Sequence, residues 1–286
     1  MENILFRDSV GRIFVERIER DYNFNMVSKH FHNEYEIYYL LNGERYYFIE
    51  KQIYHVKKGS LVFIDRNQIH KTVGVNTNYH DRILIQISAD EIRPLLELCN
   101  LDLDSFFKRN FGTIDLNEAG QKYVESLLFF IIRELKKKHS NYEFMVKMKL
   151  AELLIYAERC KTGENSTLLS LPVKTEKYKK ISEIAQYINE NYQKNMSLAD
   201  LARDFYISKC YLSRIFKEIT GFTVNEYINI TRVKRAQHLL EHTDYNITEV
   251  ADIVGYESIT YFEKVFKKYL EISPLKYKKR FNKKIG

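Results

Sequence analysis

The chain has 286 residues, of which 45% are hydrophobic and 29% are charged, and its formal net charge is +7. This composition is typical of folded globular proteins and excludes a collagen-like, low-complexity or wholly disordered chain, while the length favours two domains over one. The longest apolar run, Leu127–Ile132, is far shorter than the roughly 20 residues that a membrane-spanning helix needs. The charged residues between Met1 and Asp8 argue against a secretory signal peptide, so we expect a cytoplasmic protein with no membrane partner.

The cysteines and the distribution of charge narrow the function classes. Three cysteines without CxxC spacing indicate free thiols rather than a disulfide framework or a thiolate metal site. Residues 1–172 contain 24 basic and 24 acidic side chains, whereas residues 173–286 contain 21 basic and 14 acidic ones. A basic C-terminal segment is typical of a domain that meets a polyanion, above all nucleic acid, although a merely solvated basic surface would give the same count.

Residues 12–88 consist of short runs rich in Ile, Val, Tyr and Phe, separated by turn signals, and this pattern predicts an antiparallel sheet or barrel. Between the runs Tyr35–Leu41 and Tyr46–Ile49 lies Asn42-Gly43, a dipeptide that tolerates the positive φ angles of a tight turn. We therefore expect a hairpin at this position. The clearest runs are Tyr35–Leu41, Tyr46–Ile49, Ser60–Ile64 and Arg82–Ile87.

After Pro94 the apolar residues recur at helical spacing in two stretches, which predicts two amphipathic helices. Their apolar stripes could pack on each other, on the sheet, or across a dimer axis. The stripes are Val124, Leu127, Leu128, Ile131 and Leu135 in the first stretch, and Val146, Leu150, Leu153, Leu154 and Ala157 in the second.

A polar stretch with Pro172 shortly beyond it predicts a linker over residues 161–176. It would separate an all-β domain with appended helices, residues 1–160, from an all-α domain, residues 177–286. Within the first domain we place the barrel at about 10–90 and the helices at about 91–160.

The C-terminal third contains an internal repeat. Tyr211–Lys217 matches Tyr261–Lys267 at an offset of 50, and Leu201-Ala202 matches Val250-Ala251 at an offset of 49. Each copy is predicted as a helix, a short turn and a second helix.

These two helix-turn-helix units are expected over about 198–219 and about 246–269, with Ser208 and Ser258 as N-caps of the second helices. Those helices would direct Leu212, Ile215 and Phe216, and Phe262, Val265 and Phe266, inward at i, i+3, i+4 spacing. A further stripe, Tyr227, Ile230, Val233, Ala236 and Leu240, predicts a helix that connects the units.

The outward faces of the second helices mix cations with side chains that can contact base edges. Two such helices about 34 Å apart can read successive major-groove segments of double-stranded DNA, and the alternative is a helical bundle with a solvated charged face. We expect Arg214 and Lys264 at bases or adjacent phosphates, and Lys217, Lys267 and Lys268 at phosphates. The complete set of expected DNA-binding residues is Lys209, Cys210, Tyr211, Ser213, Arg214, Lys217, Ser258, Ile259, Thr260, Tyr261, Glu263, Lys264, Lys267 and Lys268.

Residues 181–280 resemble the DNA-binding domain of the AraC/XylS family of bacterial transcription regulators. The resemblance is strongest over Ile247–Ser258 and continues through Tyr261-Phe262, Val265–Lys268, Ser273-Pro274 and Tyr277; Arg232 and Ala236–Leu240 also match the family's connecting helix. Glu271 departs from the pattern, because members commonly have Gly there. The resemblance implies a transcription regulator that binds promoter DNA, activates by contact with RNA polymerase, and carries a small-molecule effector domain.

The segment His30-Phe31-His32, followed by Glu36 and Gly43 and later by Gly59 and His70, resembles the cupin motifs. The second motif departs from the cupin pattern at Asp65, Asn67 and Gly74. Strand alternation would place His30, His32, Glu36 and Tyr38 on one inward face, where a barrel holds a small ligand. The expected effector-binding residues are His30, His32, Glu36, Tyr38, Tyr47 and His70.

Two interpretations of this inward face stay open. His30, His32, Glu36 and His70 could bind Zn, Mn, Fe or Ni with open coordination positions. The resemblance to the regulator family, whose members usually sense small molecules without a metal, instead implies a metal-free effector pocket, and we expect that arrangement, with no cofactor.

The sequence and the resemblance therefore predict a sequence-specific DNA-binding transcription regulator. We expect an effector-responsive activator of neighbouring genes, with repression as the open alternative. It is expected to form a homodimer and to take an unidentified effector, with sugars and aromatic acids as candidate classes. No GxGxxG, GxxxxGK[ST], GxSxG or HExxH motif is present, so we do not expect an enzyme. Two alternatives remain: a metal-dependent cupin enzyme fused to a helical domain, and a DNA-binding protein whose barrel serves only for oligomerisation.

Overall fold

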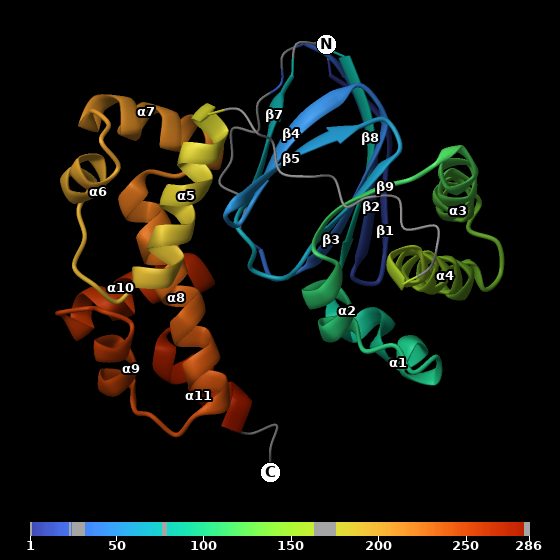
Figure 1. The fold of residues 1–286 in the computed structure, drawn as a ribbon. Coiled ribbons are helices and arrows are strands. Elements are labelled where there is room, and N and C mark those ends of the chain that lie inside the picture. Colours follow the sequence, from blue (N-terminus) through green and yellow to red (C-terminus); the bar gives the residue numbers. More distant parts are fainter. Residues whose placement is uncertain (1, 23, 25–31, 76–78, 163–175, 283–286) are drawn as a thin grey trace. The chain divides into compact units, whose positions relative to one another are not determined.

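The computed structural model describes residues 2–22, 24, 32–75, 79–162 and 176–282, and the chain forms two units, residues 1–174 and 175–286 (Figure 1). Most of the linker predicted at 161–176 lies outside the described residues. No helix in the described ranges is long and apolar enough to cross a membrane.

The first unit contains two antiparallel sheets. The larger has the strand order β1-β2-β8-β3-β6-β9 and the smaller has the order β5-β4-β7. Together they form the predicted β-rich, cupin-like domain, although the two sheets are separate ladders in the described residues. The strands are β1 (Glu2–Val10), β2 (Ile13–Asp21), β3 (Tyr35–Asn42), β4 (Glu44–Ile49), β5 (Gln52–Lys57), β6 (Ser60–Ile64), β7 (His70–Gly74), β8 (Tyr79–Ile87) and β9 (Gly112–Asp115).

The hairpin predicted at Asn42-Gly43 is wrong. β3 pairs with β6 and β8, whereas β4 pairs with β5 and β7, so this turn passes the chain from one sheet to the other. Gly43 has φ 94°, and a Cβ at this position would collide with the carbonyl oxygen of Tyr79. The dipeptide signalled a tight turn correctly, but a local signal does not determine which strand pairs with the next.

Four helices cover one face of the larger sheet (Figure 1). Two follow β8, α1 (Ala89–Leu98) and α2 (Leu103–Asn110), and two follow β9, α3 (Glu118–Lys137) and α4 (Tyr142–Thr162). All ten residues of the two predicted apolar stripes are buried in one core, together with strand residues such as Val15 and Ile85. The stripes therefore pack on each other and on the sheet rather than across a dimer axis. A second, smaller core lies between the two sheets and contains Tyr38, Leu40, Tyr47, Ile49, Tyr54, Val56, Val62 and Ile64.

The second unit is all-α, as predicted. Its helices are α5 (Glu176–Asn191), α6 (Leu198–Asp204), α7 (Lys209–Thr220), α8 (Val224–His242), α9 (Ile247–Ile253), α10 (Ile259–Leu270) and α11 (Pro274–Asn282). The connecting helix is α8, and its predicted stripe from Tyr227 to Leu240 is buried. The repeat corresponds to α6-α7 and α9-α10.

Local capping explains where the repeated helices begin. The side chains of Ser208 and Ser258 accept hydrogen bonds from the backbone N–H groups of Tyr211 and Tyr261, which confirms both predicted N-caps. The preceding helices α6 and α9 begin instead with capping boxes that contain a carboxylate, Asp200 or Glu249.

Candidate functional site

Helix α7 presents a polar face because its apolar side chains pack inward. Leu212, Ile215 and Phe216 are buried. The guanidinium of Arg214 lies over the ring of Tyr211, with its Cζ 5.8 Å from the ring centre. No carboxylate within the described part of the chain pairs with Arg214. The outward face consists of the six residues predicted from the sequence, all exposed: Lys209, Cys210, Tyr211, Ser213, Arg214 and Lys217.

Helix α10 has the same construction. Phe262, Val265 and Phe266 are buried, while all eight predicted residues of this unit are exposed. The hydroxyl of Tyr261 accepts a hydrogen bond from Asn229 Nδ2 on α8 at 3.3 Å. The exposed residues are Ser258, Ile259, Thr260, Tyr261, Glu263, Lys264, Lys267 and Lys268.

The N-termini of α7 and α10 differ from those of α6 and α9 in charge. The first turns of α7 and α10 contain no acidic residue, and their caps are neutral serines. The partial positive charge at the N-termini of α7 and α10 is therefore not neutralised. In α6 and α9, by contrast, Asp200 and Glu249 neutralise it. Such ends favour an approaching anion, and phosphate is the common one.

The second unit also contains a residue that holds its parts together. Arg232 on α8 donates from Nε to the carbonyl oxygen of Tyr192 at 2.7 Å and from Nη2 to that of Lys194 at 3.0 Å. Its guanidinium lies 5.2 Å from the centre of the Tyr256 ring, next to the turn between α9 and α10. Arg232 thus joins the loop before α6 to the second helix-turn-helix unit. The family pattern identified this arginine, but not its partners.

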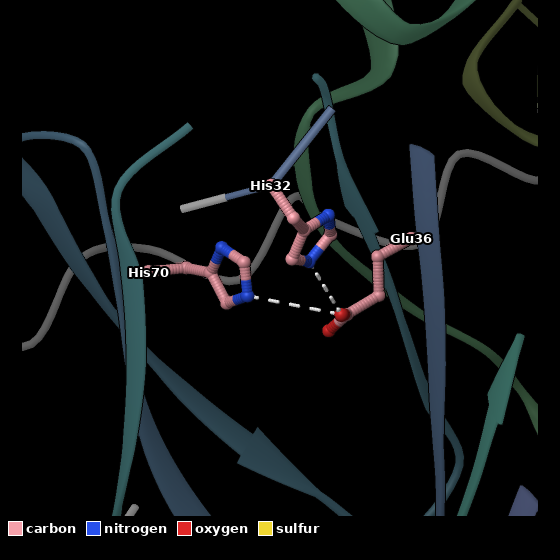
Figure 2. A group of neighbouring side chains, drawn as sticks. All are labelled: His32, Glu36 and His70. Atoms are coloured by element: carbon pink, nitrogen blue, oxygen red, sulfur yellow. Dashed lines mark hydrogen bonds and ion pairs between the residues drawn. The ribbon is translucent and has the colours of Figure 1, made fainter. Parts of the chain in front are cut away.

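The first unit brings three of the predicted effector residues together. His32 lies just before β3, Glu36 is on β3 and His70 is on β7 (Figure 2). Glu36 Oε2 lies 3.2 Å from His32 Nε2 and 3.7 Å from His70 Nε2, and both Glu36 and His70 are 1% exposed. Tyr47 donates its hydroxyl to Glu36 Oε1 at 3.0 Å, and its ring contacts that of Tyr38 edge-on at 5.2 Å.

These contacts place five of the six expected effector residues in one neighbourhood. The sixth, His30, lies outside the described residues. Their role as effector contacts stays a prediction.

The hydrogen bonds of the two imidazoles determine which nitrogens face Glu36. His32 Nδ1 lies 3.1 Å from the carbonyl oxygen of Glu34, and His70 Nδ1 lies 2.9 Å from that of Gln68. A carbonyl oxygen only accepts, so each Nδ1 carries hydrogen and each Nε2 faces the carboxylate. Burial would lower the pKa of His32, but its hydrogen bond to Glu36 and the negative charge of Glu36 outweigh burial and raise that pKa above its ordinary value.

The same geometry suits a metal ion. The ligand atoms of His32, Glu36 and His70 all lie within 4.8 Å of one another. Backbone carbonyls that hold the Nδ1 atoms are the usual outer partners of metal-binding histidines, and two imidazoles with one carboxylate suit Zn²⁺ or Fe²⁺. The triad can therefore act as an ion pair within an effector pocket or as a metal site.

Two family models match the chain. The AraC-like ligand binding domain matches residues 13–104, and a helix-turn-helix domain matches residues 201–280, which contains both repeated units. The chain belongs to the AraC/XylS family. It is accordingly a DNA-binding transcription regulator, with a ligand-binding domain at the N-terminal end.

Some relatives match most of this chain, and others match only about a third of it. The HTH-type transcriptional activator RhaR of Mannheimia succiniciproducens is 24% identical over 89% of this chain and 88% of its own length. The lactose operon transcription activator of Staphylococcus xylosus is 24% identical over 86% of this chain and 84% of its own. The Msm operon regulatory protein of Streptococcus mutans is 33% identical, but over only 35% of this chain and 36% of its own.

Among solved structures, ToxT of Vibrio cholerae with a bound unsaturated fatty acid aligns over 96% of this chain and 97% of its own. The TM-score is 0.42 and the sequence identity is 17%.

Proposed function

We propose that this regulator activates transcription by inserting α7 and α10 into successive major-groove segments of promoter DNA. The observation that carries the proposal is the pair of exposed faces on α7 and α10, each held by a buried apolar face and each beginning at an unneutralised helix N-terminus. Arg214 and Lys264 contact bases or adjacent phosphates, while Lys217, Lys267 and Lys268 bind phosphates.

The activity responds to a small molecule that binds in the first unit, near His32, Glu36, Tyr38, Tyr47 and His70. The match to an AraC-like ligand binding domain supports an effector. Two relatives that span most of the chain are named activators, one of them of a lactose operon, which supports activation and sugar-related target genes. In this proposal the activation takes place through contact with RNA polymerase. An effector acts only by binding one arrangement of the protein better than the other.

In this proposal the chain works as a homodimer in the cytoplasm and catalyses no reaction. The alternative, a metal-dependent enzyme, rests on the His32, Glu36 and His70 triad alone.

The proposal is tested in two steps. Chromatin capture of the tagged full-length protein should recover discrete fragments upstream of a few operons. The purified protein should then bind a recovered fragment with an affinity that falls steeply with salt, because phosphate contacts release counterions. Uniform weak binding to every fragment would contradict a sequence-specific regulator.

Arg214→Ala tests the assigned face. It should lower affinity for the recovered fragment by about 1 to 3 kcal/mol and affect random DNA less, because a base contact distinguishes sequences. Lys179→Ala is the matched control, since it removes one exposed cation from α5 and should leave specific binding nearly unchanged. Equal effects of the two substitutions would remove Arg214 from the interface.

A further inference from the structure

Arg45 on β4 is a buried cation without a buried anion beside it. Its side chain is among the largest that are fully buried, and the residue is 2% exposed. Its Nη2 donates to two neutral acceptors, the carbonyl oxygen of Phe24 at 2.6 Å and Thr72 Oγ1 at 3.0 Å. Its Nε is buried and has no hydrogen-bond partner among the described residues.

More positive charge surrounds Arg45. Arg20 on β2 stacks its guanidinium on the Phe24 ring at 3.9 Å, and Arg45 lies 5.7 Å from the centre of the same ring. His80 on β8 lies beside both, with its ring 6.0 Å from that of Phe24 and its Nε2 3.4 Å from Arg20 Nη1. Arg82 follows on the same face of β8, two residues along.

Arg45, Arg20, His80 and Arg82 form a cluster in which every buried polar atom without a hydrogen-bond partner among the described residues is a donor. Arg82 Nη1 and His80 Nδ1, like Arg45 Nε, are buried without a partner in the described part of the chain. Burial, and then the charges of Arg45, Arg20 and Arg82, lower the pKa of His80 to about 3, so its ring is neutral near pH 7. Because Nε2 faces a guanidinium and must accept, Nδ1 carries the hydrogen and is a donor.

The carboxylates nearby do not balance the cations. Glu2 pairs with Arg20 at 2.6 Å, and Glu16 pairs with Arg82 at 2.6 Å while it also pairs with Arg7. No acidic side chain pairs with Arg45 in the described ranges, and residues 22–31 contain no Asp or Glu. A guanidinium keeps its proton in proteins, so burying one without a counter-ion is costly.

We propose that Arg45, His80 and Arg82 bind the oxyanion of an acidic effector, with a carboxylate as its charged group. The proposal rests on the proposed effector-responsive function and makes it more specific, because it assigns a negative charge to an effector whose chemical class the sequence leaves open. A carboxylate matches the planar fork of a guanidinium and accepts from several N–H groups at once, so one such group satisfies the unpaired donors and the unpaired charge together.

The experiment measures thermal unfolding of the full-length protein with acetate and with its neutral isostere acetamide. Sodium chloride holds the ionic strength equal throughout, and inorganic phosphate forms a separate series that distinguishes a carboxylate site from a phosphate site. We expect a saturable rise in Tm of about 2 °C or more with acetate, none with acetamide, and a smaller rise with phosphate. An equal response to acetate and acetamide would overturn the proposal, and a phosphate response larger than that to acetate would overturn the assignment of a carboxylate.

Three variants locate the response. Arg45→Met should unfold at a higher temperature than the wild type without acetate, since an unpaired buried charge is gone, and should lose the acetate response. Arg45→Lys should need at least about threefold more acetate for half the shift, because a point charge replaces the fork. Thr72→Val, which removes only a neutral partner of Arg45, should keep the response.

If Arg45→Met fails to fold, Arg45→Lys and Thr72→Val still decide the matter. An acetate response of wild-type strength in Arg45→Lys, or a loss of response in Thr72→Val alone, would contradict the assignment. Since the measurement contains no DNA, its failure leaves the proposed DNA binding intact, and a failure of DNA binding leaves the acetate result intact.

Discussion

The two units differ in whether their charged side chains are buried or exposed. Among the described residues of the helical unit, the only buried polar ones are Thr220, Thr231 and Gln237, and most of the cations are exposed. The β-rich unit buries charged residues from several strands. These are Glu16, Arg20, Glu36, Arg45, His70, Lys71, His80 and Asp81.

This difference in burial of charge corresponds to the size of the ligand that each unit is proposed to bind. A DNA duplex is too large to enclose, so its phosphates are met by an exposed face supported by an apolar core. A small molecule can be surrounded, so the groups that recognise it sit inside and remain costly to bury when it is absent. The predictions that follow test this contrast.

The apolar interior of the helical unit should carry its stability. Phe262→Ala removes a fully buried ring and should destabilise this unit by about 3 to 5 kcal/mol. Lys264→Ala, two residues away on the exposed face of α10, should change stability by less than about 0.5 kcal/mol while it weakens DNA binding. Hydrogen exchange of peptides from α8 to α10 measures this in the full-length protein, and comparable losses from both substitutions would contradict the division between core and surface.

The charged interior of the β-rich unit should make it sensitive to acid. The pKa of His80 is lowered to about 3, so below its ordinary value of about 6.5 the unfolded chain binds a proton that the folded chain does not. Stability should therefore fall as the pH drops from 6.5 towards 3, by about 2 kcal/mol between pH 6.5 and 4.5. The carboxylates with lowered pKa, such as Glu2 and Asp8, lose their contribution to stability only below about pH 4.5, so they do not affect the change between pH 6.5 and 4.5.

Hydrogen exchange at pH 6.5 and 4.5 measures the effect, with rates corrected for their intrinsic pH dependence. His80→Asn should flatten the pH dependence of the β-rich unit. The helical unit, whose His238 and His242 are exposed, should lose much less stability over the same interval. An unchanged slope in His80→Asn would show that other groups cause the acid sensitivity.

The triad gives the second test of the polar interior. Added Zn²⁺ should stabilise the β-rich unit by about 2.7 kcal/mol at 100 times its dissociation constant, because three ligand atoms already lie within 4.8 Å of one another. Binding should weaken as the pH falls, because protons compete with the metal for His32, and the raised pKa of His32 moves this loss to a higher pH than an ordinary histidine would give.

The matched variants for metal binding are Glu36→Gln and Glu44→Gln. The first removes the central carboxylate and should abolish the effect, while the second neutralises an exposed glutamate and should preserve it. Equal metal binding by both variants would remove Glu36 from the site. Stoichiometric metal in protein purified without added ions would favour the metal-dependent enzyme over the metal-free regulator.

How far the fold could be predicted depends on whether its signals are local. The helices of the second unit follow from a 3.6-residue period, from Ser208 and Ser258 as caps, and from the repeat, all of which act over a few residues. The pairing of β3 depends on β6 and β8, which lie about 20 and 40 residues further along the chain, and nothing in Asn42-Gly43 reports that distance. The turn was therefore predictable, but its partner strand was not.

The site shows the same division. His32, Glu36 and His70 could be found because a motif spacing marks them. Arg45 and Arg82 stand singly in their strands, where an arginine ordinarily indicates a solvent-facing position. Only the stacking of one sheet on the other shows that they face inward, beside His80.

The smallest effect concerns a difference between the two repeats themselves. The C-cap residue is Gly221 after α7 and Glu271 after α10. Both are left-handed, with φ 86° and 58°, and both donate the backbone N–H to the carbonyl four residues back. A side chain is strained in this conformation, and a negative charge at a helix C-terminus opposes the helix dipole. Glu271→Gly should therefore stabilise the helical unit, by about 0.5 to 1 kcal/mol after the added freedom of glycine in the unfolded chain is subtracted.

Glu271→Gln separates the two causes, because it removes the charge and keeps the strained backbone, so it should recover less than half of that gain. DNA affinity should stay unchanged in both variants, since the exposed face of α10 keeps all its residues. If Glu271→Gly instead weakened specific binding, the glutamate would be setting the position of α10 rather than merely ending it, and the two repeats would differ in function as well as in stability.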